Sequence, residues 1–259
     1  DSLPVYQGEA SPENILNFSQ KFISSLKLTS YSRIPNTWTN SDNSAFLTLD
    51  LSHKTVTYKV NGGKNPAAYS GLIIPKQNQA LEVAAKFISG LNLGTTYVPQ
   101  PQNISYFKVG NSEFNSSSST DYNLIEIPFA QSVNDFPLLF GTNFIFPVQI
   151  LIGNNYTIVR AIITSQPITF SQTSSQDHNT LSESQVKSLI SQGQFQIIDA
   201  FSPQPVPVLP SQIPDITIDK VEIQYRLNDK EGLIIPYFVL TDSTSKINVT
   251  ILVPAVSLD

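Results

Sequence analysis

The chain has 259 residues and a formal net charge of -5, with 40% hydrophobic and only 14% charged residues. Its apolar content excludes an intrinsically disordered chain, which would combine low hydrophobicity with high net charge. Three arginines and the lack of any basic run exclude a basic patch for nucleic acid or an anionic membrane surface. The absence of cysteine excludes disulfides and thiolate metal sites, so a packed core must supply the stability.

Three segments have apolar residues at helical spacing. The first is predicted to start at the N-cap Ser11, with a proline at the first helical position, and to continue to about residue 26. The second covers residues 79–93 and is predicted to stop at Gly94. The third starts at Ser182, where Gln185 completes a capping box.

The first two predicted helices end in similar octapeptides. Residues 21–28 read KFISSLKL and residues 86–93 read KFISGLNL, which agree at six of eight positions. Two interpretations are open. The octapeptides mark a duplicated helix-first unit, or two short amphipathic helices have converged on the same small set of residues.

The other patterned segments alternate apolar and polar residues and are predicted to be strands. Residues 47–51 and 56–60 are predicted to form a hairpin. Short turns join most neighbouring strands, and strands and helices do not alternate regularly, which favours antiparallel over parallel sheet. The expected fold class is therefore α+β, with two to three helix-led modules of antiparallel sheet. The further predicted strands are residues 104–109, 122–129, 144–152, 156–163, 216–227, 233–240 and 247–256.

Composition also suggests connectors and a domain boundary. Residues 111–121 are mostly Ser, Asn and Thr and are expected to form an exposed loop, and residues 202–214 carry five prolines and are expected to form an extended strap. The polar stretch 171–180 precedes the third helix and is taken as the boundary. The predicted division is an N-terminal region with two helix-plus-strand units and a C-terminal helix-plus-hairpins unit: residues 1–170 (about 1–75 and 76–170) and 171–259.

Few residues suggest catalysis. His53 lies in a predicted hairpin turn and His178 in a polar segment, and both are expected to be solvated rather than to act as bases or ligands. No G-x-S-x-G or S-x-x-K signature accompanies the abundant hydroxyls. The Asn61-Gly62-Gly63-Lys64 stretch lacks the spacing of a phosphate-binding loop and is expected to be a tight turn. We therefore predict no catalytic residue, no metal site and no cofactor.

Two groups of residues leave alternatives open. Asp215, Asp219 and Glu222 are close enough in sequence to suggest a carboxylate or calcium site, although a solvated or structural role is the expectation. Trp38, the single tryptophan, lies in a polar stretch and is the candidate anchor for a binding partner. The alternative is that this tryptophan folds onto the nearest core.

The C-terminal third carries a family resemblance. Residues 221–225 (VEIQY), 233–240 (LIIPYFVL) and 252–256 (LVPAV) resemble the closing hairpins of PepSY-like domains. The layout is similar to the ectodomains of YycH/YycI-type regulators, bacterial proteins tethered outside the membrane by one N-terminal helix. The resemblance covers residues 181–256 and, more faintly, 11–60 and 79–163. It rests on core positions, so no functional residue is carried over.

The resemblance implies a non-enzymatic, extracytoplasmic interaction or regulatory domain. Its expected partner is a protein: a membrane kinase, a peptidase or an envelope component. Since no apolar run approaches the ~20 residues needed to span a bilayer, membrane attachment is expected only through a segment upstream of Asp1; the alternative is a processed cytosolic protein. Competing functions are a glycan- or cell-wall-binding module and a hydrolase with an unfamiliar carboxylate site.

Overall fold

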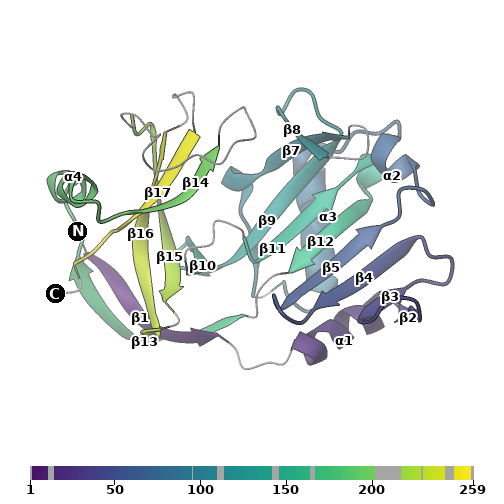
Figure 1. Ribbon diagram of the computed structural model, residues 1–259, viewed down its shortest axis with the longest axis horizontal. Coiled ribbons are helices and arrows are strands. Elements are labelled where there is room, and N and C mark those ends of the chain that lie inside the picture. Colours follow the sequence, from purple (N-terminus) through teal and green to yellow (C-terminus); the bar gives the residue numbers. More distant parts are fainter. Residues whose placement is uncertain are drawn as a thin grey trace. The chain divides into compact units, whose positions relative to one another are not determined.

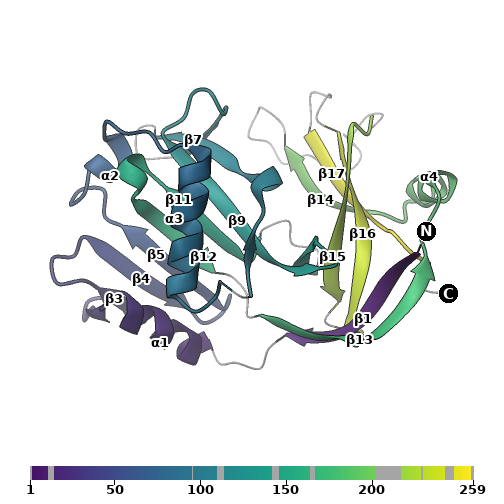
Figure 2. The same cartoon turned by 180° about the vertical axis from the view of Figure 1, so that it is seen from behind.

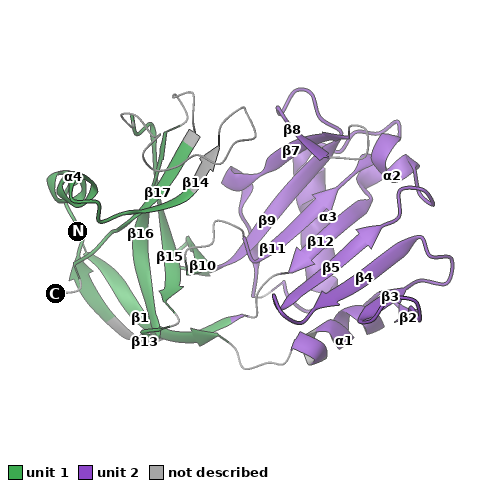
Figure 3. Ribbon diagram, in the orientation of Figure 1, with its two compact units in different colours: residues 1–10, 132–145, 168–259 green, residues 11–131, 146–167 purple. Residues whose placement is uncertain are grey.

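The chain folds into two compact units (Figures 1 and 3). Unit 1 contains residues 1–10, 132–145 and 168–259, and unit 2 contains residues 11–131 and 146–167. The chain therefore passes from one unit to the other four times. The computed structural model describes residues 2–10, 15–94, 96–109, 114–141, 146–163, 167–201, 217–228, 230–242 and 248–257.

Unit 2 is built on an antiparallel sheet. Its strands pair in the order β2-β3-β4-β5-β12-β11-β9-β7-β8, and β6 pairs with β9 beside β7. The predicted hairpin of residues 47–51 and 56–60 is confirmed as β4 and β5. The strand bounds are β2 Thr29–Ser30, β3 Thr37–Thr39, β4 Ala45–Asp50, β5 Thr55–Val60, β6 Val98–Pro99, β7 Ser105–Val109, β8 Phe114–Ser117, β9 Leu124–Val133, β11 Val148–Ile152 and β12 Ile158–Ile163.

Two helices, α1 (Ile15–Ser25) and α3 (Gln77–Gly90), lie on one face of this sheet (Figure 2). Helix α3 buries Ala80, Ala84 and Ile88, which are four residues apart and so lie along one side of the helix. These side chains share one core with apolar residues of both α1 and the strands. The short helix α2 (Ala67–Ser70) adds Ala68 to a second, smaller cluster.

The similar octapeptides end α1 and α3 in the same way. Leu28 N donates to Ile23 O at 2.9 Å, and Leu93 N donates to Ile88 O at 3.0 Å. The residue before each leucine has a left-handed backbone, with φ of 52° at Lys27 and 59° at Asn92. This is a Schellman-type helix stop. The stop of α3 is therefore Asn92 and not the predicted Gly94; duplication of a whole unit stays a prediction.

Unit 1 is built on a mixed sheet. Strand β16 pairs antiparallel with β15 along one edge. Along its other edge, β16 pairs antiparallel with β1 at residues 233–234 and with β17 at residues 237–242. The sheet is extended by β14 beside β17, by β13 beside β1, and by β10 in parallel with β15. Helix α4 (Glu183–Ser191) packs on β17 and its neighbours. The bounds are β1 Ser2–Ala10, β10 Phe136–Phe140, β13 Ile168–Asn179, β14 Gln196–Phe201, β15 Lys220–Asn228, β16 Leu233–Asp242 and β17 Asn248–Pro254.

The predicted fold class was wrong. Strands account for 48% of the structure and helices for 20%, so the protein is mostly β and its modules are not led by helices. The first element is strand β1, which precedes α1. The expected polar boundary 171–180 lies almost wholly within β13, which pairs with β1. Such polar strands are held by backbone pairing with a distant partner, which local hydrophobic alternation does not reveal.

Two predicted connectors lie partly or wholly outside the described residues. The proline-rich segment 202–214 is outside them entirely. Of the predicted loop 111–121, residues 111–113 are also outside, whereas residues 114–117 form strand β8. The expectation that the whole of 111–121 is a loop was therefore wrong for β8, which pairs with β7.

The core of unit 1 contains two tyrosines whose rings lie 6.0 Å apart, Tyr6 and Tyr225. Asn134 Nδ2 donates to Tyr6 Oη at 2.8 Å. The Tyr225 hydroxyl is buried and makes no hydrogen bond of normal geometry to the described residues. Burial raises the pKa of Tyr225 to about 12, although the nearby Asn134 amide offsets part of the rise.

We expect these two hydroxyls to differ in their contribution to stability. Tyr225→Phe removes a buried hydroxyl that makes no hydrogen bond of normal geometry, so the free energy of unfolding stays the same or rises by up to about 1 kcal/mol. Tyr6→Phe leaves the Asn134 amide without its acceptor and costs about 1 kcal/mol. Urea unfolding of both variants measures the difference, and a larger loss for Tyr225→Phe contradicts this assignment.

Candidate functional site

Helix α4 starts as the sequence predicts. Ser182 is the N-cap, with Gln185 N donating to Ser182 Oγ at 3.4 Å and Ser182 N donating to Gln185 Oε1 at 2.8 Å. These two bonds form the predicted capping box. The helix then places Val186, Leu189 and Ile190 against the sheet of unit 1, where all three stay only partly buried. Among the described residues, α4 has no fully buried side chain.

An apolar groove of about 750 Å³ lies between α4 and the sheet. Val186 and Ile190 line it from the helix, and Val221 and Phe238 are among its apolar residues on β15 and β16. Val221 remains 59% exposed although it is a strand residue. The volume lies in the usual range of ~300–1,000 Å³ for ligand pockets. The full lining is Leu181, Glu183, Val186, Lys187, Ile190, Ser191, Ile218, Val221, Phe238 and Leu240.

Polar groups on α4 border this groove. Lys187 Nζ lies 2.6 Å from Glu183 Oε1, one helical turn apart, and both side chains are exposed. The hydrogen bond and the positive charge of Lys187 lower the pKa of Glu183. The Ser191 side chain borders the groove one turn further along the helix. An apolar floor with a polar border is typical of the core and rim of a protein interface.

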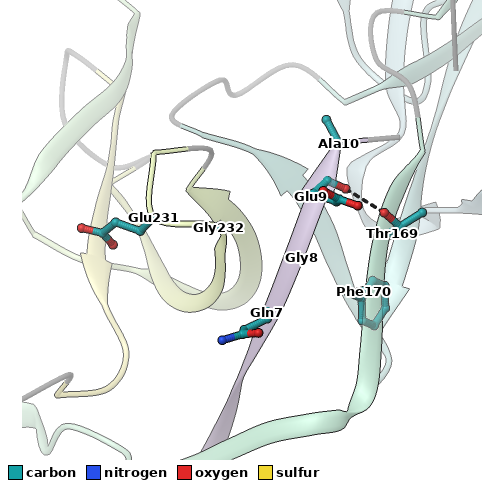
Figure 4. A pocket seen from close by; sticks show the side chains of 8 residues that line it. All are labelled: Gln7, Gly8, Glu9, Ala10, Thr169, Phe170, Glu231 and Gly232. Carbon is teal, nitrogen blue, oxygen red and sulfur yellow. Dashed lines mark hydrogen bonds between the residues drawn. The ribbon is translucent and has the colours of Figure 1, made fainter. Parts of the chain in front are cut away.

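A second pocket in unit 1, of about 710 Å³, is more polar (Figure 4). It lies beside the point where the pairing of β1 with β13 shifts register, between Tyr6 and Gly8. Gly8 N donates to Gly232 O at 3.0 Å, and a Cβ atom on Gly8 would lie 2.5 Å from Ile234 Cδ1. This close approach explains the glycine. The lining residues are Gln7, Gly8, Glu9, Ala10, Thr169, Phe170, Glu231 and Gly232.

The two carboxylates of this pocket do not converge. Figure 4 shows the Glu231 carboxylate turned away from the strand that carries Glu9. Asn228 Nδ2 donates to Glu231 Oε2 at 2.9 Å and holds it in that position. Glycoside hydrolysis needs two carboxyl groups facing one bond, so this pocket gives no support to the hydrolase alternative.

His53 lies in an exposed turn with Ser52 and Asp50, the three residue types of a hydrolase triad. Their geometry differs from a triad. Ser52 Oγ and Asp50 Oδ2 both approach the same ring nitrogen, His53 Nδ1, at 3.1 and 2.8 Å. A triad needs the serine and the carboxylate on opposite nitrogens. Asp50 instead accepts the backbone N–H groups of Ser52 and His53, and the hydrogen bonds from Ser52 and His53 hold its pKa well below the usual range.

The other predicted polar features make local contacts where they are described. His178 Nδ1 lies 2.9 Å from Ser257 O, at the end of β13. The predicted turn at Gly62 and Gly63 is confirmed, with Lys64 N donating to Asn61 O at 3.0 Å. Glu222 lies 3.1 Å from Lys220 Nζ, whereas Asp215, its proposed companion, lies outside the described residues.

Trp38 lies in β3, half-buried and packed against the main core of unit 2. This is the placement that the alternative interpretation describes. Its role as an anchor for a partner stays a prediction.

A second apolar surface, which sequence analysis does not predict, lies in the loop of residues 71–75 of unit 2. Leu72 is fully exposed, and Ile73 and Ile74 are 55% and 50% exposed. In the sequence these residues look like a buried strand, and only the structure shows that they face outward. Hydrophobic alternation cannot distinguish a short buried apolar run from an exposed one.

Comparisons with known proteins assign no family and no function to this chain. No family model matches it, and neither the curated proteins nor the solved structures give a match. Within the described ranges, no three His, Asp or Glu side chains gather as metal ligands would. No helix in the described part of the chain is both long and apolar enough to cross a membrane.

Proposed function

We propose that the protein is a non-enzymatic interaction domain that binds an apolar, extended segment of a partner protein in the groove between α4 and β15–β16. The observation that carries the proposal is the groove itself, in which Val221 is 59% exposed on a sheet face otherwise covered by α4. Both walls are aliphatic or aromatic, and the border carries charges of both signs. A peptide can use both features, whereas an acyl chain has nothing to pair with the charges.

Further support comes from the composition and from the resemblance in the C-terminal third. Low charge with many neutral polar residues suits a protein that acts outside the cytoplasm, and the resemblance implies an extracytoplasmic partner such as a membrane kinase, a peptidase or an envelope component. We extend the proposal to that location, with attachment to the membrane through a segment upstream of Asp1. Fusion of the full gene product to a reporter enzyme active only outside the cytoplasm tests the location.

The groove is tested with a displayed library of random dodecapeptides selected on the wild-type protein. We expect enriched peptides with apolar residues at alternate positions, and a loss of affinity of tenfold or more in Val221→Asp, since the new carboxylate would lie on the apolar floor. Val98→Asp is the matched control, because Val98 is also an exposed strand valine but lies in unit 2. Circular dichroism checks that both variants fold.

Two results contradict the proposal. One is a library that yields no peptide, and the other is a set of peptides that bind Val221→Asp as well as they bind the wild type. Binding of a cell-wall glycan probe that is insensitive to Val221→Asp would favour the glycan-binding alternative instead.

A further inference from the structure

The loop of residues 71–75 in unit 2 presents three adjacent aliphatic side chains to solvent. Leu72 is fully exposed, Ile73 and Ile74 are at least half exposed, and no charged residue interrupts the segment. Single exposed apolar residues are ordinary on a protein surface, but a contiguous apolar patch indicates an interaction site.

Hydrogen bonds to neighbouring elements fix the shape of this loop. Asn155 N donates to Ile73 O at 2.8 Å, and Tyr122 Oη donates to Pro75 O at 2.9 Å. Lys76 N donates to Tyr156 Oη at 3.2 Å. With its backbone bonded at three points between residues 73 and 76, the loop holds its aliphatic side chains outward.

Amphipathic side chains surround the base of the loop. Besides Tyr122 and Tyr156, Tyr106 lies here, its ring 4.8 Å from that of Tyr122 and its hydroxyl bonded to Gln77 Oε1 at 2.9 Å. Lys76 is exposed beside them. Tyrosine and lysine side chains place apolar stems next to a bilayer and polar ends in the headgroup layer.

We propose that this loop inserts Leu72, Ile73 and Ile74 into the surface of a neutral lipid bilayer, with Tyr106, Tyr122, Tyr156 and Lys76 at the level of the headgroups. Three side chains fall far short of the ~800 Å² that each partner buries in a standard protein interface. They suffice for weak, reversible partitioning, on the order of the 10⁴ M⁻¹ of a single acyl chain. The net charge of -5 means that anionic lipids add no attraction.

The absence of cysteine allows a direct test. Leu72→Cys is labelled with the environment-sensitive fluorophore nitrobenzoxadiazole and titrated with phosphatidylcholine vesicles. We expect a blue shift and increased intensity as the probe enters the apolar layer. Leu51→Cys is the matched control, because Leu51 is also exposed, at 49%, but lies just before the Thr55 end of β5. The loop of residues 71–75 follows helix α2, which packs at the opposite end of β5, where Tyr69 Oη donates to Val60 O. The emission of the label at position 51 is expected not to shift.

Partitioning of unlabelled variants gives the magnitude. Leu72→Asp is expected to lower the vesicle partition coefficient about tenfold or more, because full burial of one leucine corresponds to at least that factor. Leu51→Asp is expected to leave it unchanged, and raising the salt concentration is expected not to weaken binding.

The proposal is overturned if the probes at positions 72 and 51 respond alike, or if Leu72→Asp partitions like the wild type. It is also overturned if sedimentation shows a dimer that Leu72→Asp dissociates, since the loop would then be an interface between copies of the chain. Val221→Asp should partition normally, so this experiment is independent of the α4 groove.

Discussion

Gly153→Ala is expected to destabilise unit 2 by about 3 kcal/mol, the upper part of the usual cost of overpacking. A Cβ atom at this position would lie 2.0 Å from Ala68 O and 2.8 Å from Val159 Cγ1. The first of these contacts is with the backbone of α2, which cannot avoid the methyl group by changing a side-chain rotamer. The helix must therefore move as a whole.

Chemical denaturation followed by tryptophan fluorescence measures this loss. Trp38 is the single tryptophan and packs on the core of unit 2, so its emission reports the unfolding of that unit. Gly90→Ala is the matched control, because a Cβ atom there meets nothing within 4 Å and lies in helix α3. That variant is expected to gain up to about 1 kcal/mol from helix propensity. Equal effects of the two substitutions would contradict the steric explanation.

The same substitution connects the fold to the proposed bilayer contact. Asn155, two residues after Gly153, holds the backbone of Ile73, and α2 directly precedes the loop. Displacement of α2 is therefore expected to loosen the loop before unit 2 unfolds, which faster hydrogen exchange at residues 71–76 would show.

Arg226→Ala is expected to cost about 3 kcal/mol in unit 1, through the loss of hydrogen bonds from a charged donor and of the packing of its stem. The side chain is 1% exposed, with Nη2 donating to Gln224 Oε1 at 2.7 Å and Nη1 donating to Gly141 O at 3.0 Å. Burial lowers the pKa of Arg226 to about 10, so the guanidinium stays charged at neutral pH. Truncation removes two donors from buried acceptors and also removes the packing of the stem.

Arg226→Met separates these two contributions. It keeps an apolar side chain in place of the stem, so it is expected to recover at least half of the loss. Urea unfolding followed by circular dichroism measures both variants, and hydrogen exchange in β15 and β16 locates the effect. Arg33→Ala, at an exposed arginine, is expected to stay within about 0.5 kcal/mol of the wild type. A loss below 1 kcal/mol for Arg226→Ala would show that the buried guanidinium contributes little.

The elements that the sequence predicts best are those with local signals. The capping box at Ser182 and the alternation in β4 and β5 depend on residues within a few positions of one another, and both are found in the structure. Strand β13 has no such signal, since residues 171–179 carry no aliphatic side chain, and it exists because β1 supplies its backbone partners. Pairing between segments so distant in sequence is what turned an expected α+β fold into a mostly β one.

The candidate sites were predictable only in part. The third helix was expected, but the groove beside it depends on β15 and β16 lying under α4, which is a tertiary arrangement. The apolar residues 72–74 give the same pattern whether they are buried or exposed. Their outward orientation comes from hydrogen bonds that the loop makes with Asn155, Tyr122 and Tyr156. In each of the two bonds with a tyrosine, the two partners lie at least 47 positions apart in the sequence.

The discontinuous units have a consequence for the order of events during synthesis. All residues of unit 2 have been made once residue 167 has been added, whereas β1 must wait for partners that start at Ile168 and extend to Ile234. At usual translation rates of about 5 to 20 residues per second, about 10 to 45 s pass between the synthesis of β1 and that of Ile234. During that time β1 is a nascent strand with unpaired edges, the kind of segment that recruits wrong partners. Pro4, which removes one backbone donor, and Glu9, which adds a charge, both make such mispairing less favourable.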